Sequence, residues 1–89
     1  MQRREVEVLN KEGLDAPASA KLAQIASTYL SEVSVARSGR KVNAKSVMGV
    51  MMLAAGRGSR IVIETDGPDE SEALEAIVAL IASHLGGYA

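Results

Sequence analysis

Asp15 and Ser46 each stand at the start of a predicted helix, where interaction with an anion is favourable. The N–H groups in the first turn of a helix have no partner within the helix, and the helix dipole adds positive charge there. The Asp15 carboxylate can in principle attack phosphorus and form an acyl phosphate. Asp and Ser are also among the best N-cap residues, so each can instead accept a hydrogen bond from a backbone N–H of its own helix. For Asp15 both interpretations stay open.

The residues beside Asp15 make phosphate chemistry at this helix start harder. Pro17 has no N–H, so it removes one of the donors that would face an anion, although proline is tolerated in the first helical turn. The Asp15 carboxylate is already negative and repels an incoming phosphoryl group. The nearby sequence offers no second acidic cluster that predicts a metal site to offset this repulsion.

Other kinds of catalytic site are excluded by composition. The chain has no cysteine, which excludes disulfides, thiolate zinc sites and a cysteine nucleophile. A single histidine, His84, makes a histidine metal cluster or a Ser/His/Asp triad unconvincing. No acid and base pair can be assembled from what remains, so we expect no stand-alone enzyme, no metal and no cofactor.

The charge balance argues against two classes of partner. Ten Lys and Arg residues face eleven Asp and Glu residues, for a net charge of −1, and the chain has two Tyr with no Phe or Trp. A chain with this charge has no positive field that would attract nucleic acid or anionic lipid, and with so few aromatic residues it has no surface on which bases could stack. No apolar run is long enough for a signal peptide or a membrane span. We therefore expect a cytoplasmic protein that binds neither nucleic acid nor membrane.

Residues that alternate between apolar and polar predict four strands. The predicted strands are a first one that contains Val6 and Val8 and ends near Leu9, a hairpin of residues 32–37 and 40–43 that turns at Ser38-Gly39, and a fourth around Ile61-Val62-Ile63. The apolar residues of the hairpin include Val33 and Val35.

Apolar residues at helical spacing predict three helices. The first covers roughly Ala16 to Leu30, with an apolar stripe of Ala18, Leu22, Ile25, Ala26 and Tyr29. A short helix follows Ser46 and contains the apolar run Val47 to Leu53. The last helix follows Asp69, whose side chain is expected to cap it with Glu72 three residues later. Its apolar stripe is Ala73, Leu74, Ile77, Leu80, Ile81 and Leu85, His84 lies in its last turn, and Gly86-Gly87 is its expected stop.

The order of elements is β-α-β-β-α-β-α, and a chain of 89 residues is long enough for one domain and too short for two. No linker or internal repeat interrupts it. Helices with one apolar stripe and strands with one apolar face suit a two-layer α+β fold. We therefore predict one domain over residues 1–89, with an antiparallel sheet covered on one face by helices.

Three segments of the chain resemble the HPr family, the small phosphocarriers of the phosphoenolpyruvate-dependent sugar phosphotransferase system. They are Gly13-Leu14-Asp15-Ala16 at the strand-to-helix turn, the run from Val42-Asn43-Ala44-Lys45-Ser46 to Val50, and Asp66-Gly67-Pro68-Asp69-Glu70 before the last helix. The resemblance covers nearly the whole chain. It implies an open-faced β-sandwich with strand order 1-4-2-3 and three helices on one side. It also implies that enzyme I and sugar-specific carrier domains are partners of a monomeric protein.

The resemblance breaks at the residue that carries phosphate in the family. An alignment without gaps places Asp15 at the phosphoacceptor histidine and Pro17 at an arginine, with Ala16 between them. A gapped alignment would pair Pro17-Ala18-Ser19 with a family Pro-Ala-Ser, but the inserted helical residue would rotate the apolar stripe by about 100°. We prefer the ungapped alignment. It predicts that relay from enzyme I is absent or very weak.

The resemblance also implies a regulatory site, and the apolar run after Ser46 predicts a docking surface. Ser46 matches a serine that a dedicated HPr kinase/phosphorylase modifies in many family members. An HPr-like regulatory module that acts through Ser46 and docking, without relay, is thus the alternative function. The docking surface is expected to contain the residues Ala20, Gln24, Val47, Met48 and Met51, with Lys21, Lys45 and Arg57 at its rim. We expect Met48 outside the core and Met51 inside it.

Overall fold

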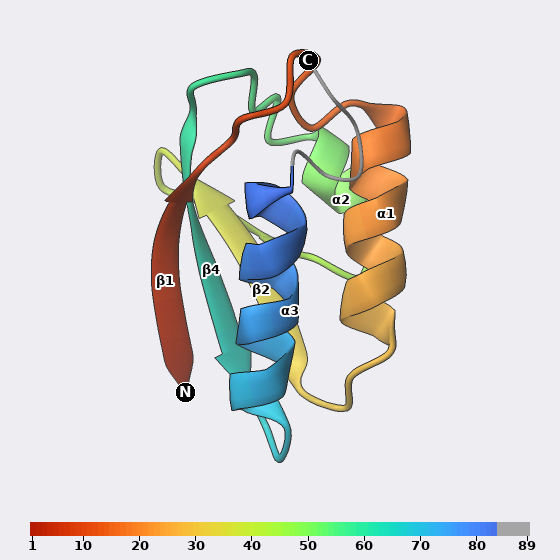
Figure 1. Cartoon of the computed structure of the whole chain (residues 1–89), viewed down its shortest axis with the longest axis vertical. Coiled ribbons are helices and arrows are strands. Elements are labelled where there is room, and N and C mark those ends of the chain that lie inside the picture. Colours follow the sequence, from red (N-terminus) through yellow and green to blue (C-terminus); the bar gives the residue numbers. More distant parts are fainter. Residues whose placement is uncertain (84–89) are drawn as a thin grey trace.

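The computed structural model describes residues 1–83, and they form an α+β domain. Its elements are β1 (Gln2–Glu7), α1 (Ala16–Ser27), β2 (Glu32–Arg37), β3 (Arg40–Asn43), α2 (Val47–Met51), β4 (Arg60–Asp66) and α3 (Glu70–Ala82). The strands form one antiparallel sheet in the order β1-β4-β2-β3. All three helices in this part of the chain lie on one side of the sheet, as predicted (Figure 1).

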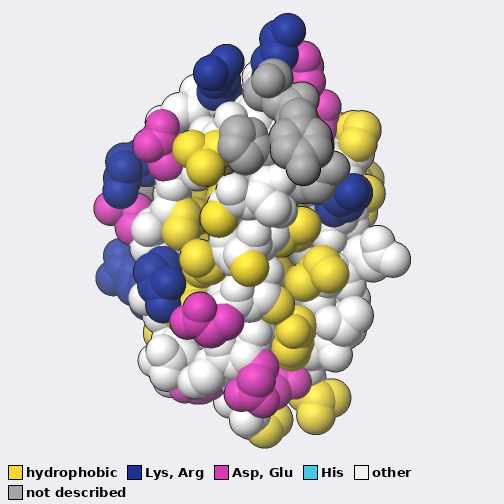
Figure 2. All heavy atoms as spheres, viewed as in Figure 1, with side chains coloured by type: hydrophobic (Ala, Val, Ile, Leu, Met, Phe, Trp, Pro, Cys, Tyr) yellow, Lys and Arg dark blue, Asp and Glu magenta, His cyan; other side chains and the backbone are white. Residues whose placement is uncertain are grey.

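The core lies between the sheet and the helices. Strand residues with alternate spacing, among them Val33, Val35, Ile61 and Ile63, point from the sheet into it and are fully or almost fully buried. The helices add Ala18, Leu22, Ala26, Val50, Ala73, Leu74, Ile77 and Ile81. Arg4 of β1 also reaches the helical layer, where its guanidinium lies 3.1 Å from the Glu75 carboxylate. In this view several charged side chains gather on the β1 side and hydrophobic ones over α1 and α3 (Figure 2).

The hairpin and the order of elements confirm the sequence prediction. Ser38 and Gly39 both have positive φ, 52° and 83°, which matches the twist that a two-residue hairpin turn needs. Strand β1 ends at Glu7 rather than near Leu9, because Val8 bonds the loop before β4: its N–H donates to the Ser59 carbonyl at 2.8 Å.

Helix α1 ends at Ser27, three residues before the predicted end at Leu30. The Thr28 hydroxyl donates to the Ile25 carbonyl at 2.7 Å, and the Lys45 ammonium donates to the Tyr29 carbonyl at 2.9 Å. Side chains thus satisfy carbonyls that a longer helix would have bonded to its own N–H groups.

The prediction that the Asp69 side chain caps α3 is wrong. Asp69 occupies the N-cap position, but its carboxylate makes no capping bond and its φ and ψ of −116° and 32° are not those of an extended cap. The carboxylate instead accepts hydrogen bonds from Leu30 and Ser31, in the connection between α1 and β2. The predictions for His84, Leu85 and Gly86-Gly87 lie outside the described residues.

Candidate functional site

The turn that leads into α1 is fixed by Gly13 and Leu14. Gly13 has a φ of 67°, and a Cβ atom there would lie 2.5 Å from the Ala55 carbonyl oxygen, so only glycine fits. The Leu14 N–H donates to the same carbonyl at 2.8 Å, and the Leu14 side chain is buried. The next residue, Asp15, is therefore held in one place against the loop before β4.

Asp15 caps α1. Its backbone is extended, with φ −76° and ψ −173°, and its Oδ1 accepts the N–H of Ala18 at 3.1 Å. The side chain is half-buried, whereas Ala16 and Pro17 are exposed. The capping interpretation from the sequence is confirmed.

This cap leaves little of the helix start for an outside anion. The Ala18 N–H is bonded to Asp15, the Ser19 N–H donates to the Asp15 carbonyl at 2.8 Å, and Pro17 has no N–H. A phosphoryl group that approached Asp15 would therefore meet a negative carboxylate and few first-turn donors.

Ser46 caps α2 in the same way. Its Oγ accepts the N–H of Gly49 at 3.0 Å, which confirms the capping interpretation of Ser46 as well. A Cβ atom on Gly49 would lie 3.3 Å from the Ser46 Oγ, so glycine gives the hydroxyl room. The Ser46 side chain is half-buried, at the surface end of a helix start, where a phosphate is electrostatically favoured.

Helix α2 presents an exposed apolar surface, which we name the methionine patch: Val47, Met48, Met51 and Met52. Met48 is 75% exposed, Met52 62% and Met51 41%. The prediction that Met48 lies outside is confirmed and the prediction that Met51 lies inside is wrong. A helix of five residues has room for one inward side chain, which is Val50, and Leu53 fills the core beyond it.

Helix α1 packs beside α2, so the methionine patch lies near the exposed side chains of α1 (Figure 1). Ala16, Ala20 and Gln24 are exposed and follow each other at intervals of four residues, which places them on one face of α1. Of the predicted rim residues, Lys21 and Arg57 are exposed. Lys45 is half-buried and bonds the Tyr29 carbonyl, so its ammonium is committed to the fold.

Arg37 and Arg40 position the methionine patch, and sequence reasoning missed them. The Arg37 guanidinium donates to the Leu53 carbonyl at 3.1 Å, and the Arg40 guanidinium donates to the Met52 carbonyl at 3.3 Å. Both arginines flank the β2–β3 turn, so they fix the C-terminal end of α2 to the hairpin. No local pattern in the sequence links these segments.

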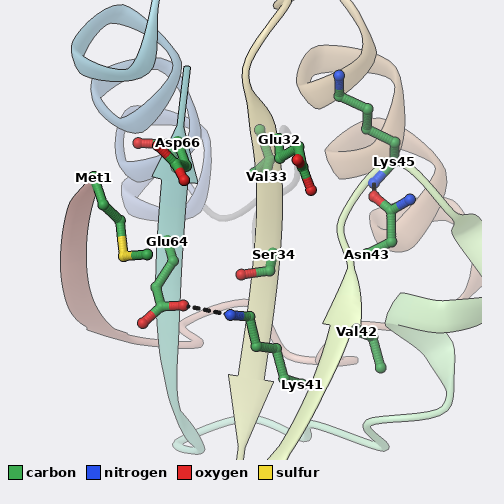
Figure 3. Close-up of a pocket in the computed structure, with 11 residues that line it drawn as sticks. Met1, Glu32, Val33, Ser34, Lys41, Val42, Asn43, Lys45, Glu64 and Asp66 are labelled. Atoms are coloured by element: carbon green, nitrogen blue, oxygen red, sulfur yellow. Dashed lines mark hydrogen bonds and ion pairs between the residues drawn. The ribbon is translucent and has the colours of Figure 1, made fainter.

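The face of the sheet that the helices do not cover has a hollow of about 380 Å³, lined mostly by residues of β2, β3 and β4 (Figure 3). Lys41 of β3 reaches across it and lies 2.8 Å from Glu64 of β4. The hydrogen bond from Lys41 lowers the pKa of Glu64 from its usual value. These groups are satisfied by each other. Among residues 1–83, no group of three His, Asp or Glu side chains could hold a metal ion, and no helix is long and apolar enough to cross a membrane.

The sequence is similar to HPr proteins over almost all of its length. The family described as PTS HPr component phosphorylation site matches residues 2–83. Phosphocarrier protein HPr of Cupriavidus necator is 57% identical over 86 residues, which are 97% of each chain. HPr-like protein Crh of Halalkalibacterium halodurans is 48% identical over 81 residues, 91% of this chain and 96% of that protein.

Solved structures show the same similarity. HPr-C-His from Thermoanaerobacter tengcongensis superimposes with a TM-score of 0.96 at 39% identity and covers 100% of both chains. HPr from Bacillus anthracis gives a TM-score of 0.85 at 44% identity, over 88% of this chain and 93% of that one. A structure described as an HPr dimer from T. tengcongensis gives 0.78 at 40% identity, over 98% and 100%.

Proposed function

Because the chain belongs to the HPr family, the phosphocarrier proteins of the phosphoenolpyruvate-dependent sugar phosphotransferase system, we propose that it works in that system with the relay step at position 15 absent or very weak. The observation that carries this proposal is the bond between the Asp15 Oδ1 and the Ala18 N–H at 3.1 Å. The family scaffold is intact, whereas the acceptor position holds a carboxylate that already caps its own helix.

Three physical arguments favour a weak relay. The carboxylate repels the incoming phosphoryl group, because both carry negative charge. The Asp15 Oδ1 already accepts the Ala18 N–H, so an attack on phosphorus through this oxygen must break that hydrogen bond. Pro17 lacks both an N–H and the guanidinium that an arginine would aim at a phosphoryl oxygen. Each of these three features raises the barrier to phosphoryl transfer without changing the fold.

The proposed partners are enzyme I and sugar-specific carrier domains, docked on the methionine patch and on the exposed residues Ala16, Pro17, Ala20 and Gln24 of α1. An exposed apolar surface of this kind favours protein docking, and methionine side chains adapt to several partners. We propose that the chain acts in the cytoplasm as a monomer, and its relatives include proteins described as dimers.

The substitution Met48→Asp is expected to weaken binding to enzyme I by about tenfold or more. It places a charge at the most exposed side chain of the patch, where burial against a partner then costs free energy. Isothermal titration calorimetry measures the affinity, and light scattering on the same sample checks the monomer. Leu30→Asp is the matched control, because Leu30 is 81% exposed beyond the far end of α1. Equal losses in the two variants would contradict the docking site.

A regulatory module without relay is the second candidate function. Two features favour it: the carboxylate at the family's acceptor position, which caps α1, and the presence of a serine hydroxyl at the start of α2. The similarity to HPr-like protein Crh gives weak further support. In this function, partners would sense the phosphorylation state of Ser46 or compete for the methionine patch, and Asp15 would need no acceptor chemistry.

An HPr kinase is expected to add one phosphate to this chain with ATP, and Ser46→Ala is expected to accept none. The phosphate would sit at the start of α2, where its charge is favoured, so the fold should persist. Intact-mass analysis counts the phosphates, and circular dichroism checks the fold. Thr28→Ala is the control, because Thr28 is an exposed hydroxyl residue at the C-terminal end of α1, outside α2. No added phosphate on the unsubstituted chain would count against this second function.

A further inference from the structure

The sulfur atoms of this chain are gathered on one surface. The chain has no cysteine and four methionines, and three of the four lie between residues 48 and 52. Met48, Met51 and Met52 are all exposed, and they belong to the methionine patch. Met1 is the fourth and is 70% exposed, at the start of β1. Because the chain has no cysteine to react first, an oxidant that attacks accessible sulfur reacts with these methionines, and three of them lie on the proposed docking surface.

The residues that anchor α2 to the rest of the fold contain no sulfur. Helix α2 is anchored by Val50 and Leu53, which are 0% and 4% exposed, and by the cap at Ser46. The Arg37 guanidinium holds the Leu53 carbonyl, a backbone atom that a change in a methionine side chain does not remove. A chemical change at the methionine sulfur atoms thus alters the surface and leaves its support in place.

We propose that Met48, Met51 and Met52 form an oxidative modification site that controls docking at the methionine patch. This inference rests on the docking function proposed above. The reactant is a hydroperoxide: a methionine sulfur attacks the terminal peroxide oxygen, the O–O bond breaks, an S=O bond forms, and water or an alcohol leaves. The sulfur is oxidised by two electrons and the peroxide is reduced by two. Methionine sulfoxide reductases reverse the change.

The sulfoxide weakens docking because it is polar where the patch is apolar. A methionine that contacts a partner buries a flexible apolar side chain, whereas a sulfoxide buries a strong acceptor that needs a hydrogen bond. An unsatisfied polar group in an interface costs enough to weaken binding by about tenfold. Because three adjacent side chains change together, we expect at least this loss after full oxidation.

The test treats the whole chain with hydrogen peroxide and follows each methionine by peptide mapping. Met48 and Met52 are expected to oxidise as fast as Met1, and Met51 more slowly, in line with their exposure. The thermal unfolding midpoint should stay unchanged. Affinity for enzyme I, measured by calorimetry, should fall by about tenfold or more and should recover after treatment with methionine sulfoxide reductases.

The variant Met48→Leu, Met51→Leu, Met52→Leu is the matched control. Leucine has a volume close to that of methionine and no sulfur, so whatever affinity this variant has for enzyme I should be the same before and after treatment. It keeps Met1, so a loss that the variant also shows would come from elsewhere and would overturn the inference.

The outcomes separate this inference from the function on which it rests. If the untreated chain binds enzyme I and the oxidised chain binds equally well, the oxidative control is wrong and docking stands. If the untreated chain and the leucine variant both fail to bind, the proposed docking function is wrong and the control of docking falls with it. If residues 48–52 take up no oxygen while Met1 is oxidised, the modification site itself is wrong.

Discussion

The double substitution Asp15→His, Pro17→Arg is expected to turn this chain into a fast phosphoryl acceptor from phosphoenolpyruvate and enzyme I. The unsubstituted chain should show little or no transfer under the same conditions. We expect the rate to rise by at least about a hundredfold, the scale on which a single oriented donor changes a reaction that develops negative charge. This effect on activity is the largest that the geometry of the site predicts.

Each substitution removes a different obstacle at the start of α1. Asp15→His replaces a negative nucleophile with one that is neutral, and it releases the Ala18 N–H that Asp15 now holds. Pro17→Arg restores one backbone N–H and supplies a guanidinium that can bind a phosphoryl oxygen by two hydrogen bonds. The loss of the Asp15 cap costs about 1 kcal/mol of stability. The fold should tolerate this loss, because Gly13 and the buried Leu14 fix the turn without the cap.

The chemistry of the adduct distinguishes histidine from aspartate. A phosphohistidine survives alkali, whereas an acyl phosphate on Asp15 is hydrolysed by alkali and is converted by hydroxylamine to a stable hydroxamate, so the two are told apart by intact mass after each treatment. The variant Asp15→Asn, Pro17→Arg is the control, because the asparagine amide is not expected to accept phosphate. A rapid, stoichiometric, hydroxylamine-labile adduct on the unsubstituted chain would show that Asp15 relays after all and would refute the proposal of a weak relay.

The parts of the fold that could be predicted from the sequence are those set by neighbours in the chain. Ser38-Gly39 predicts the β2–β3 turn, and both residues adopt the positive φ that such a turn needs. Asp15 and Ser46 predict helix starts, and each accepts a bond from an N–H three residues later. In these cases the pattern and its structural consequence lie within one turn of the chain.

The features that could not be predicted depend on contacts between distant segments. The position of Met51 depends on whether Val50 and Leu53 already fill the space beneath α2. Arg37 meets a carbonyl 16 residues away, which no local pattern marks. Asp69 has the sequence of a cap, yet a stronger set of donors across the fold claims its carboxylate. A prediction from neighbouring residues fails where a group from a distant segment binds the same side chain.

Asp69 joins two connections of the fold that are far apart in sequence. Its carboxylate accepts the N–H groups of Leu30 and Ser31, each at 2.9 Å, and the hydroxyl of Ser31. The Asp69 N–H donates back to the Ser31 hydroxyl at 3.2 Å. Ser31 is almost fully buried, so the removal of the carboxylate leaves its N–H and its hydroxyl proton without an acceptor.

The substitution Asp69→Ala is therefore expected to lower the thermal unfolding midpoint at neutral pH by roughly 10 °C, since it removes three hydrogen bonds to one charged group. Asp69→Asn should cause a smaller fall, because the amide keeps one of the two acceptor oxygens. Its NH₂ group replaces the second oxygen and cannot accept a hydrogen bond there. Differential scanning calorimetry measures both. Glu12→Ala, at an exposed loop carboxylate, is the control and should leave the midpoint nearly unchanged.

The same contacts make part of the stability depend on pH. The hydrogen bond from the Ser31 hydroxyl, followed by that from the Leu30 N–H, lowers the pKa of Asp69 from its usual value. The folded protein therefore holds this proton less tightly than the unfolded chain. The stabilising effect is fully present above the unfolded pKa and is lost as pH falls through the lowered folded pKa.

As pH falls below the usual range of a carboxyl group, the midpoint of the unsubstituted chain should thus approach that of Asp69→Asn. The fall of the midpoint with pH has other contributions, because Glu70 and Glu64 also have lowered pKa values. The Gly67 N–H lowers the pKa of Glu70, and the hydrogen bond from Lys41 lowers the pKa of Glu64. The unsubstituted chain and Asp69→Asn both keep Glu64 and Glu70, so the difference between their curves of midpoint against pH isolates Asp69. A difference that stays constant down to the acid limit would mean that the carboxylate charge contributes nothing, and the account of Asp69 as a charged link between the connections would be wrong.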